Sequence, residues 1–204
     1  MKSSLKNMVL VMFCITLIAG ACVGLVYNIT EEPIAKAKAQ AVQDALAEVL
    51  PEFDKTEKSE HTADGLQIVA YEATLDSNVV GYAIESATKN GFSGLVRIMV
   101  GFDKAGTILN VKVLEQAETP GLGAKMTEED NSLLASVKGK EASKVKLMVK
   151  KDGGDVDALT AATISSRAYT EAVARAYSVF KVVAGWEKEI QSTTGASQTK
   201  KKEE

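Results

Sequence analysis

Hydrophobic residues are spread unevenly along this chain, and the longest run lies near its start. Residues 8–27 contain one clearly polar side chain, Thr16, and no charged residue occurs between Asn7 and Thr30. An α-helix rises about 1.5 Å per residue, so this stretch is long enough to cross a hydrocarbon core of about 30 Å. The pattern predicts a transmembrane helix over residues 7–30, preceded by a short tail over residues 1–6.

The apolar run has two interpretations. A cleaved signal peptide would use Lys2 and Lys6 as its basic region and residues 19–21, Ala-Gly-Ala, as its cleavage site. The run continues to Val26, which is longer than a signal core needs, so we favour an uncleaved anchor. Lipoprotein cleavage before Cys22 is disfavoured, because alanine stands where that signal usually has a larger aliphatic residue.

Basic residues flank the apolar run on both sides, so the charge bias that orients membrane helices is small. Lys2 and Lys6 precede the helix, and Lys36 and Lys38 follow it. A short tail before a single helix nevertheless favours export of everything beyond it. We therefore expect a single-pass protein of the cell (inner) membrane, with a cytoplasmic tail and an extracytoplasmic domain.

A second helical pattern follows the membrane segment. Glu31, Glu32 and Pro33 are typical of the first turn of a new helix, where acidic residues are favourable and proline is tolerated. Apolar residues then recur at helical spacing until Pro51 ends the pattern; they are Ile34, Ala37, Ala41, Ala45 and Val49. The sequence predicts a stalk helix over residues 31–51.

Strand patterns dominate the next part of the chain. Runs rich in β-branched and aliphatic residues predict four strands, at 67–74, 79–87, 95–102 and 107–114. The turn residues at 103–106, Asp-Lys-Ala-Gly, predict that the last two strands form a hairpin. A mostly antiparallel sheet is therefore expected.

The C-terminal part is predicted to be mainly helical. A short helix is expected at 127–137, with Thr127 and Asp130 in a capping arrangement, and another strand at 144–150. A long helix is predicted to begin near Thr163, with Ala168, Ala172, Ala176, Phe180 and Val183 along one face. We therefore predict an α+β domain over residues 52–190, with helices packed on the sheet, and a disordered polar tail over residues 191–204.

Composition removes several functional classes. The only histidine, His61, excludes multi-histidine zinc sites and leaves one candidate for a serine–histidine mechanism. The only cysteines, Cys14 and Cys22, stand about 12 Å apart on one helix, too far for a disulfide. No metal site is predicted, and any electron transfer would require an organic cofactor. A net charge of −3 and 5% aromatic residues argue against nucleic-acid binding.

Two segments are candidates for ligand binding. From residue 153 to 166, a glycine turn leads into Thr160, Thr163, Ser165 and Ser166 and directly into a helix, whose unpaired N–H groups can bind an anion. Simple helix capping by these hydroxyls is the alternative. Residues 118–123, Glu-Thr-Pro-Gly-Leu-Gly, form either a loop shaped against a ligand or a tight connection.

Together these segments resemble one family, the FMN-binding domain of the G subunit of the Rnf electron-transport complex and of the C subunit of the sodium-pumping NADH:quinone oxidoreductase. The resemblance covers most of the chain beyond the membrane segment. It is carried by residues 91–94 (Gly-Phe-Ser-Gly), 99–103 (Met-Val-Gly-Phe-Asp), 118–123 (Glu-Thr-Pro-Gly-Leu-Gly) and 157–166 (Asp-Ala-Leu-Thr-Ala-Ala-Thr-Ile-Ser-Ser).

The resemblance implies a covalent cofactor. The flavinylation motif of that family reads Asp, two variable residues, Ser or Thr, Gly, Ala, Thr. This chain matches it at Asp157, Thr160, Ala162 and Thr163, with Ala161 where glycine is usual. FMN would be joined by a phosphoester to Thr163, by a separate flavin transferase that uses FAD and magnesium. The resemblance also places Glu118, Thr119, Leu122 and Gly123 beside the flavin. From the loop and helix-start patterns we expect Gly121, Ser165 and Ser166 at the cofactor as well.

The resemblance also implies a role. The short chain and single anchor favour the Rnf subunit, a one-flavin relay among other membrane subunits that move electrons between ferredoxin and NAD and couple this to ion transport. Such a domain alone catalyses no complete reaction, so no catalytic residue is expected. Two alternatives stay open: the C subunit of the sodium-translocating enzyme, and an anchored FMN-binding domain of another extracytoplasmic electron-transfer route. A structural module without flavin is a third.

Overall fold

The computed structural model describes residues 5–188 of the chain. Contacts divide the chain into two compact units, Met1–Gln43 and Asp44–Glu204. The predictions for Lys2 and for the polar tail over residues 191–204 lie outside the described residues.

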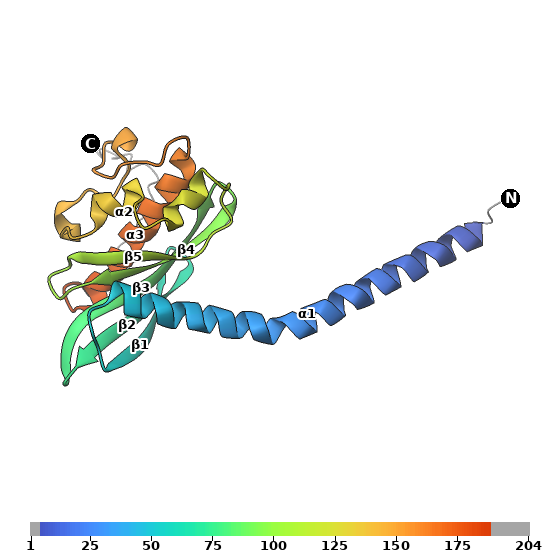
Figure 1. Ribbon diagram of the computed structural model, residues 1–204, viewed down its shortest axis with the longest axis horizontal. Coiled ribbons are helices and arrows are strands. Elements are labelled where there is room, and N and C mark those ends of the chain that lie inside the picture. The colour runs from blue at the N-terminus through green and yellow to red at the C-terminus, as the bar shows by residue number, and fades with distance from the viewer. Residues whose placement is uncertain (1–4, 189–204) are drawn as a thin grey trace, which may run out of the picture. The chain divides into compact units, whose positions relative to one another are not determined.

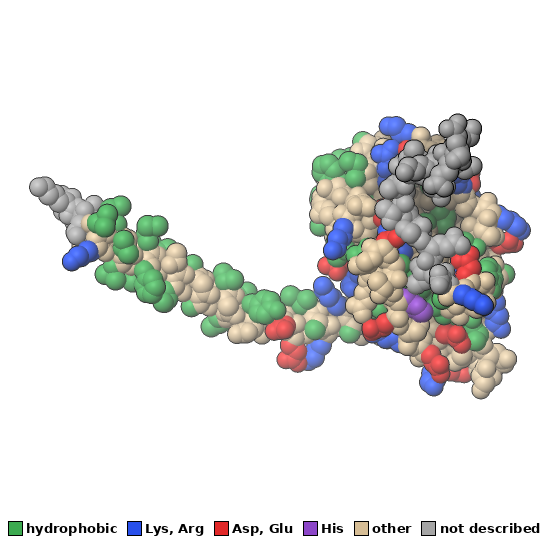
Figure 2. Space-filling model, turned by 180° about the vertical axis from the view of Figure 1, so that it is seen from behind, with side chains coloured by type: hydrophobic (Ala, Val, Ile, Leu, Met, Phe, Trp, Pro, Cys, Tyr) green, Lys and Arg blue, Asp and Glu red, His purple; other side chains and the backbone are tan. Residues whose placement is uncertain are grey.

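A single helix, α1 (Leu5–Val49), occupies the first part of the chain. Its apolar portion has a mean hydropathy of 2.7 and none of it is buried, as in a membrane-spanning helix. Hydrophobic side chains cover the face of this portion that is visible in Figure 2. The prediction of a separate helix beginning at Glu31–Pro33 is wrong, because α1 continues through Pro33. The Glu32–Lys36 ion pair (2.6 Å) spans the proline, and the helix-forming alanines that follow favour continuation. The helix ends before Pro51, as predicted.

Five antiparallel strands form one sheet in sequential order. They are β1 (Lys55–Ala63), β2 (Leu66–Leu75), β3 (Asn78–Gly91), β4 (Gly94–Phe102) and β5 (Ile108–Glu115). The four predicted strands and the β4–β5 hairpin are confirmed. Strand β1 was not predicted, because it is an exposed edge strand of mostly charged and polar residues, and so carries little hydrophobic signal.

The main core lies between one face of the sheet and helix α3 (Thr163–Val183), which packs chiefly against β3 and β4 (Figure 1). The predicted helix start at Thr163 is confirmed. Of its predicted apolar face, Val183 is partly buried, and four members are fully buried against the sheet: Ala168, Ala172, Ala176 and Phe180. This layering confirms the predicted α+β class, and the start of α3 lines the same cavity as Phe92 in the β3–β4 turn.

The opposite face of the sheet receives the last turns of α1. Leu46 and Val49 are buried there, and Gly101 on β4 lies so close that a Cβ atom would overlap the Val49 carbonyl group. At the rim, Lys112 forms an ion pair with Glu48 (2.7 Å). A glycine in the middle of a strand thus provides the space for a backbone-to-backbone approach.

The segment between β5 and α3 consists of short elements. They are η1 (Gly123–Thr127), α2 (Ser132–Val137), η2 (Ala142–Lys144) and η3 (Lys150–Asp152). The predicted helix at 127–137 is shorter than expected. Its cap is Asn131, whose side chain accepts from the Leu134 amide (2.9 Å), rather than Thr127, which belongs to η1.

The predicted strand at 144–150 is wrong. Residues in this segment pair locally with the residues that follow them: the amides of Asp155 and Val156 donate to the carbonyls of Lys146 and Met148. Val149 and Val156 form only an isolated bridge. The apolar residues that suggested a strand belong to a tight loop instead. Within this loop, Val149 and Val156 are buried.

Candidate functional site

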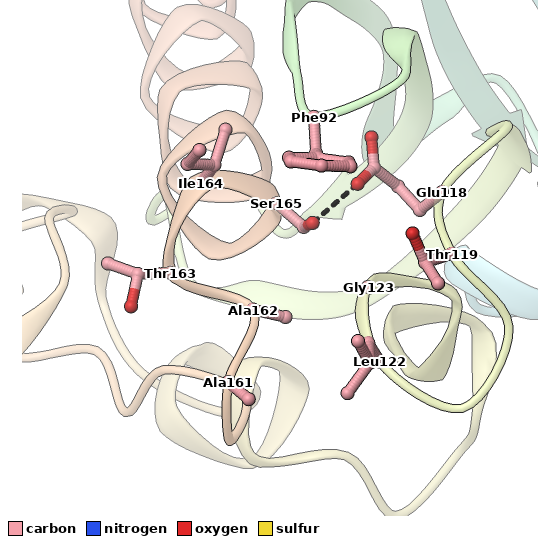
Figure 3. Close-up of a pocket in the computed structure, with 10 residues that line it drawn as sticks. All are labelled: Phe92, Glu118, Thr119, Leu122, Gly123, Ala161, Ala162, Thr163, Ile164 and Ser165. Carbon is pink, nitrogen blue, oxygen red and sulfur yellow. Dashed lines mark hydrogen bonds between the residues drawn. The ribbon is translucent and has the colours of Figure 1, made fainter.

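A cavity of about 340 Å³ opens between three segments that are distant in sequence (Figure 3). Its walls come from the tip of the β3–β4 hairpin, the loop that follows β5, and the start of α3. Cofactor sites commonly have volumes of about 300–1,000 Å³. The lining residues are Phe92, Glu118, Thr119, Leu122, Gly123, Ala161, Ala162, Thr163, Ile164 and Ser165. The two segments that sequence reasoning identified separately therefore meet in one site.

The start of α3 forms one side of this cavity. Ala161 has a φ of +57°, a left-handed conformation that turns the chain into the helix, and Ala162 occupies the N-cap without any capping side chain. None of the predicted hydroxyl groups caps the helix, so the simple capping interpretation is wrong. The first-turn N–H groups of α3 therefore have no capping side chain, and with their partial positive charge they are available to an anionic group at this end.

Ser166 has a structural role. Its hydroxyl accepts from the Leu159 amide (2.9 Å) and donates to the Ala162 carbonyl (2.8 Å), and the residue is fully buried outside the cavity lining. These two bonds hold the loop before α3 against the first turn of the helix. Ser166 therefore positions Ala162 and Thr163 without facing the cavity itself.

Asp157 and Thr160, at the other end of the motif, also lie outside the cavity lining. The Asp157 carboxylate accepts from Lys150 Nζ (2.8 Å), and this bond holds the pKa of the carboxyl below its ordinary value. Its amide donates to the hydroxyl of Ser136 on α2 (2.9 Å). Thr160 is exposed. These two residues present the outer side of the motif to solvent.

Glu118 joins the three walls of the cavity. Its Oε1 accepts from the Ser93 amide at the hairpin tip (3.1 Å), and its Oε2 accepts from the Ser165 hydroxyl on α3 (2.5 Å; Figure 3). The side chain is almost completely buried. A carboxylate from the loop after β5 thus connects the hairpin to the helix.

The glycines of the loop over residues 118–123 serve different purposes. A Cβ atom at Gly123 would overlap the Ser165 hydroxyl, so this glycine allows the loop to lie against α3. Gly121 has a φ of +75° and open space around it, so its role is to turn the chain. Gly121 does not line the cavity.

Apolar side chains surround the opening. Phe92, Ile164 and Leu122 expose 66%, 46% and 40% of their surface, which is unusual for large apolar residues outside a binding site or interface. Phe92, Ile164 and Ala161 line the cavity but were not among the predicted site residues. A signal was available for Phe92, because an aromatic residue between Gly91 and Ser93 at a hairpin tip has no core to enter.

Predicted site residues thus fall into two groups. Those that line the cavity are Glu118, Thr119, Leu122, Gly123, Ala162, Thr163 and Ser165; those that do not are Gly121, Asp157, Thr160 and Ser166. His61 lies on β1, hydrogen-bonded to Ser59 (3.0 Å), away from these lining residues. Within residues 5–188, no group of three or more His, Cys, Asp or Glu side chains is arranged to hold a metal ion.

Comparison with known proteins identifies the family. The FMN-binding domain family matches residues 91–178. Three relatives, each named as the G subunit of an ion-translocating oxidoreductase complex, are similar over most of their length. The one from Shewanella piezotolerans is 36% identical, with 84% of this chain and 87% of the relative covered. The relative from Methanosarcina acetivorans is 32% identical, with 84% of this chain and 92% of the relative covered. The relative from Aliivibrio fischeri is 31% identical, with 89% of this chain and 92% of the relative covered.

The cavity has the features that FMN requires. Phe92, Leu122 and Ile164 offer apolar surface to a flat ring system, and the uncapped N-terminus of α3 offers backbone donors to a phosphate group. All three wall segments lie within the residues that the family matches. The chain therefore belongs to the family of G subunits of ion-translocating oxidoreductase (Rnf) complexes and contains the FMN-binding domain of that family.

Proposed function

We propose that this chain is a membrane-anchored flavoprotein subunit that relays electrons through a covalently bound FMN within a ferredoxin:NAD oxidoreductase complex coupled to ion transport. The observation that carries the proposal is the cavity to which both Thr163 and the loop over residues 118–123 contribute. The relatives named above, all G subunits, favour this role over the C subunit of the sodium-translocating enzyme.

Thr163 is the proposed attachment point. It is the first residue of α3, on the opposite side of the cavity from Glu118 and Thr119 (Figure 3). Its hydroxyl oxygen would form the phosphoester bond, and the N–H groups of the first helical turn would donate to the phosphate oxygens. FMN supplies reversible electron acceptance in its ring system. The covalent bond would keep the cofactor in place where free FMN is scarce.

The outer side of the motif is proposed to face the enzyme that attaches the cofactor. Asp157 and Thr160 lie outside the cavity and remain accessible from solvent. A flavin transferase that delivers FMN from FAD would recognise these side chains by contact, while Thr163 receives the FMN phosphate. This division of the motif gives its residues separate tasks, recognition outside the cavity and attachment at its edge.

The proposed membrane arrangement follows from α1. The apolar part of this helix would cross the bilayer over residues 7–30, and residues 31–51 would connect it to an extracytoplasmic FMN-binding domain over residues 52–190. The other subunits of the complex would exchange electrons with the domain on that side.

The test is attachment of flavin to Thr163. The wild-type chain, co-expressed with a flavin transferase, should gain the mass of FMN and give a fluorescent band that survives denaturing electrophoresis. Thr163→Ala should lose both signals completely, because only a hydroxyl can form the phosphoester. Thr163→Ser should retain partial labelling, and Thr160→Ala should retain some, since Thr160 lies outside the cavity. Covalent FMN on Thr163→Ala, or none on the wild type, would contradict the assignment.

A further inference from the structure

We propose that Glu118 lowers the reduction potential of the flavin by holding a negative charge in the cavity wall. This inference rests on the proposed binding of FMN in the cavity and goes beyond it, because it assigns one side chain control over how readily the cofactor accepts electrons.

Glu118 is buried, and neighbouring polar groups hold its carboxylate in place. The residue is only 4% exposed, and the structure gives both carboxylate oxygens as hydrogen-bond acceptors, from the Ser93 amide and the Ser165 hydroxyl. A charged carboxylate is an acceptor at both oxygens, so these two donors match its ionised form. Among residues 5–188, no lysine or arginine forms an ion pair with it.

Two glycines make room for this carboxylate. A Cβ atom at Gly91 would lie 2.6 Å from Glu118 Oε1, and one at Gly123 would lie 2.8 Å from Oε2. Any side chain at either position would therefore press on the carboxylate. The hairpin tip and the loop both leave space for Glu118, which indicates that the carboxylate is a fixed part of the cavity wall.

The effect on the cofactor follows from electrostatics. Reduction adds electrons to the flavin ring, and a nearby negative charge opposes this addition. The opposition is stronger for a buried charge than for one in water, because the local dielectric constant is lower, and Glu118 is almost completely buried. No lysine or arginine of the described residues pairs with Glu118, so no ion pair neutralises its charge. The carboxylate therefore biases the site toward the oxidised flavin.

Glu118→Gln is the central variant. Glutamine has the same shape, and its amide can accept from Ser93 and donate to Ser165, so the substitution removes the charge and keeps both contacts. In the full-length flavin-loaded protein, two-electron reduction should become at least tenfold more favourable, a rise of about 30 mV in midpoint potential. Spectroelectrochemical titration measures this value, and intact mass confirms that each variant carries FMN.

Two further variants separate charge from hydrogen bonding. Ser165→Ala removes a donor to the carboxylate but keeps the charge, so it should not raise the potential. Glu141→Gln makes the same substitution on a residue outside the cavity lining, paired with Lys144 (2.8 Å), and should leave the potential unchanged. An equal rise in Ser165→Ala, or no rise in Glu118→Gln, would overturn the inference.

The remaining outcomes are also decisive. Loss of folding or of flavin uptake in Glu118→Gln would give Glu118 a purely structural role and overturn the inference. If the wild type carries no covalent FMN, the proposed attachment fails instead. The same comparison is then made with free FMN, from the affinities of wild type and Glu118→Gln for its oxidised and reduced forms, and absence of any binding to the wild type would overturn both proposals.

Discussion

Ala161 shows how one residue determines the geometry of the proposed attachment site. It adopts a φ of +57°, a conformation that costs an L-residue about 1–2 kcal/mol because its Cβ approaches the carbonyl oxygen. This conformation turns the chain into α3 and leaves the helix start free of capping side chains. The flavinylation motif that the chain resembles has glycine at this position, which adopts such a conformation without steric cost.

Ala161→Gly is therefore expected to stabilise the domain. Relief of the left-handed strain should outweigh the extra backbone entropy of glycine and raise the free energy of unfolding by up to about 1 kcal/mol. Thermal melting of the detergent-solubilised chain should show an increase of about 2–4 °C. Ala162→Gly is the matched control, because Ala162 has a φ of −130° and gains no such relief. A lower melting temperature for Ala161→Gly would contradict this account.

At the scale of secondary-structure elements, the end of α1 and the sheet depend on one close contact. The backbone of Val49 packs closely against Gly101 on β4, and Leu46, one turn earlier in α1, is also buried. Two polar contacts to Glu48 lie at the rim, the ion pair from Lys112 and a hydrogen bond from Asn110 to its carbonyl (3.3 Å). Close apolar packing, rather than these exposed contacts, should supply most of the stability of this junction.

Gly101→Ala should weaken that junction. The added methyl group would overlap the Val49 carbonyl, a backbone atom that cannot rotate away, so we expect a loss of about 1–3 kcal/mol in unfolding free energy. Denaturant unfolding can be followed by the fluorescence of Trp186, the only tryptophan, whose ring packs against Phe180.

Lys112→Gln provides the control for this junction. It removes the ion pair to Glu48, whose side chains are more than a third exposed, and should cost less than about 1 kcal/mol. A smaller loss for Gly101→Ala than for Lys112→Gln would show that the close backbone approach does not hold the junction.

At the scale of the whole molecule, the chain combines an exposed apolar helix with a charged soluble domain. Side chains along the first part of α1 are apolar and solvent-exposed, whereas both signs of charge are interspersed over the visible face of the domain (Figure 2). Such a helix is stable in a bilayer and costly in water. The two units therefore suit two different solvents, lipid and water.

Export of the domain can be tested by cysteine labelling. With Cys14 and Cys22 replaced by alanine, Lys89→Cys places one thiol at an exposed position of the domain. A membrane-impermeant maleimide should label it in intact spheroplasts. The matched variant Ser4→Cys, on the other side of the apolar run, should react only after lysis. Labelling of Ser4→Cys alone in intact spheroplasts, or a mature N-terminus at Cys22, would refute the proposed topology.

Local sequence patterns were enough to predict much of this protein's secondary structure. The apolar run, four strands and the start of α3 at Thr163 were all predicted, because periodicity and turn residues act over a few neighbours. The same reasoning missed β1, whose polar residues become a strand only by pairing with β2, and it placed a strand at 144–150 where the chain bonds to residues 155 and 156 instead. It also began a new helix at Glu31, although Pro33 lies inside α1.

The candidate site was likewise predicted only in part from the sequence. Residue types identified the loop over residues 118–123 and the start of α3, and resemblance to a motif identified Thr163. Only the tertiary structure brought these segments together with Phe92 and showed that Glu118 bonds to both Ser93 and Ser165. It also separated Thr163, in the cavity wall, from Asp157, outside it. The physical reason is that such contacts join residues 25 or more positions apart, and the packing of α3 on the sheet, not any local pattern, fixes which of them meet.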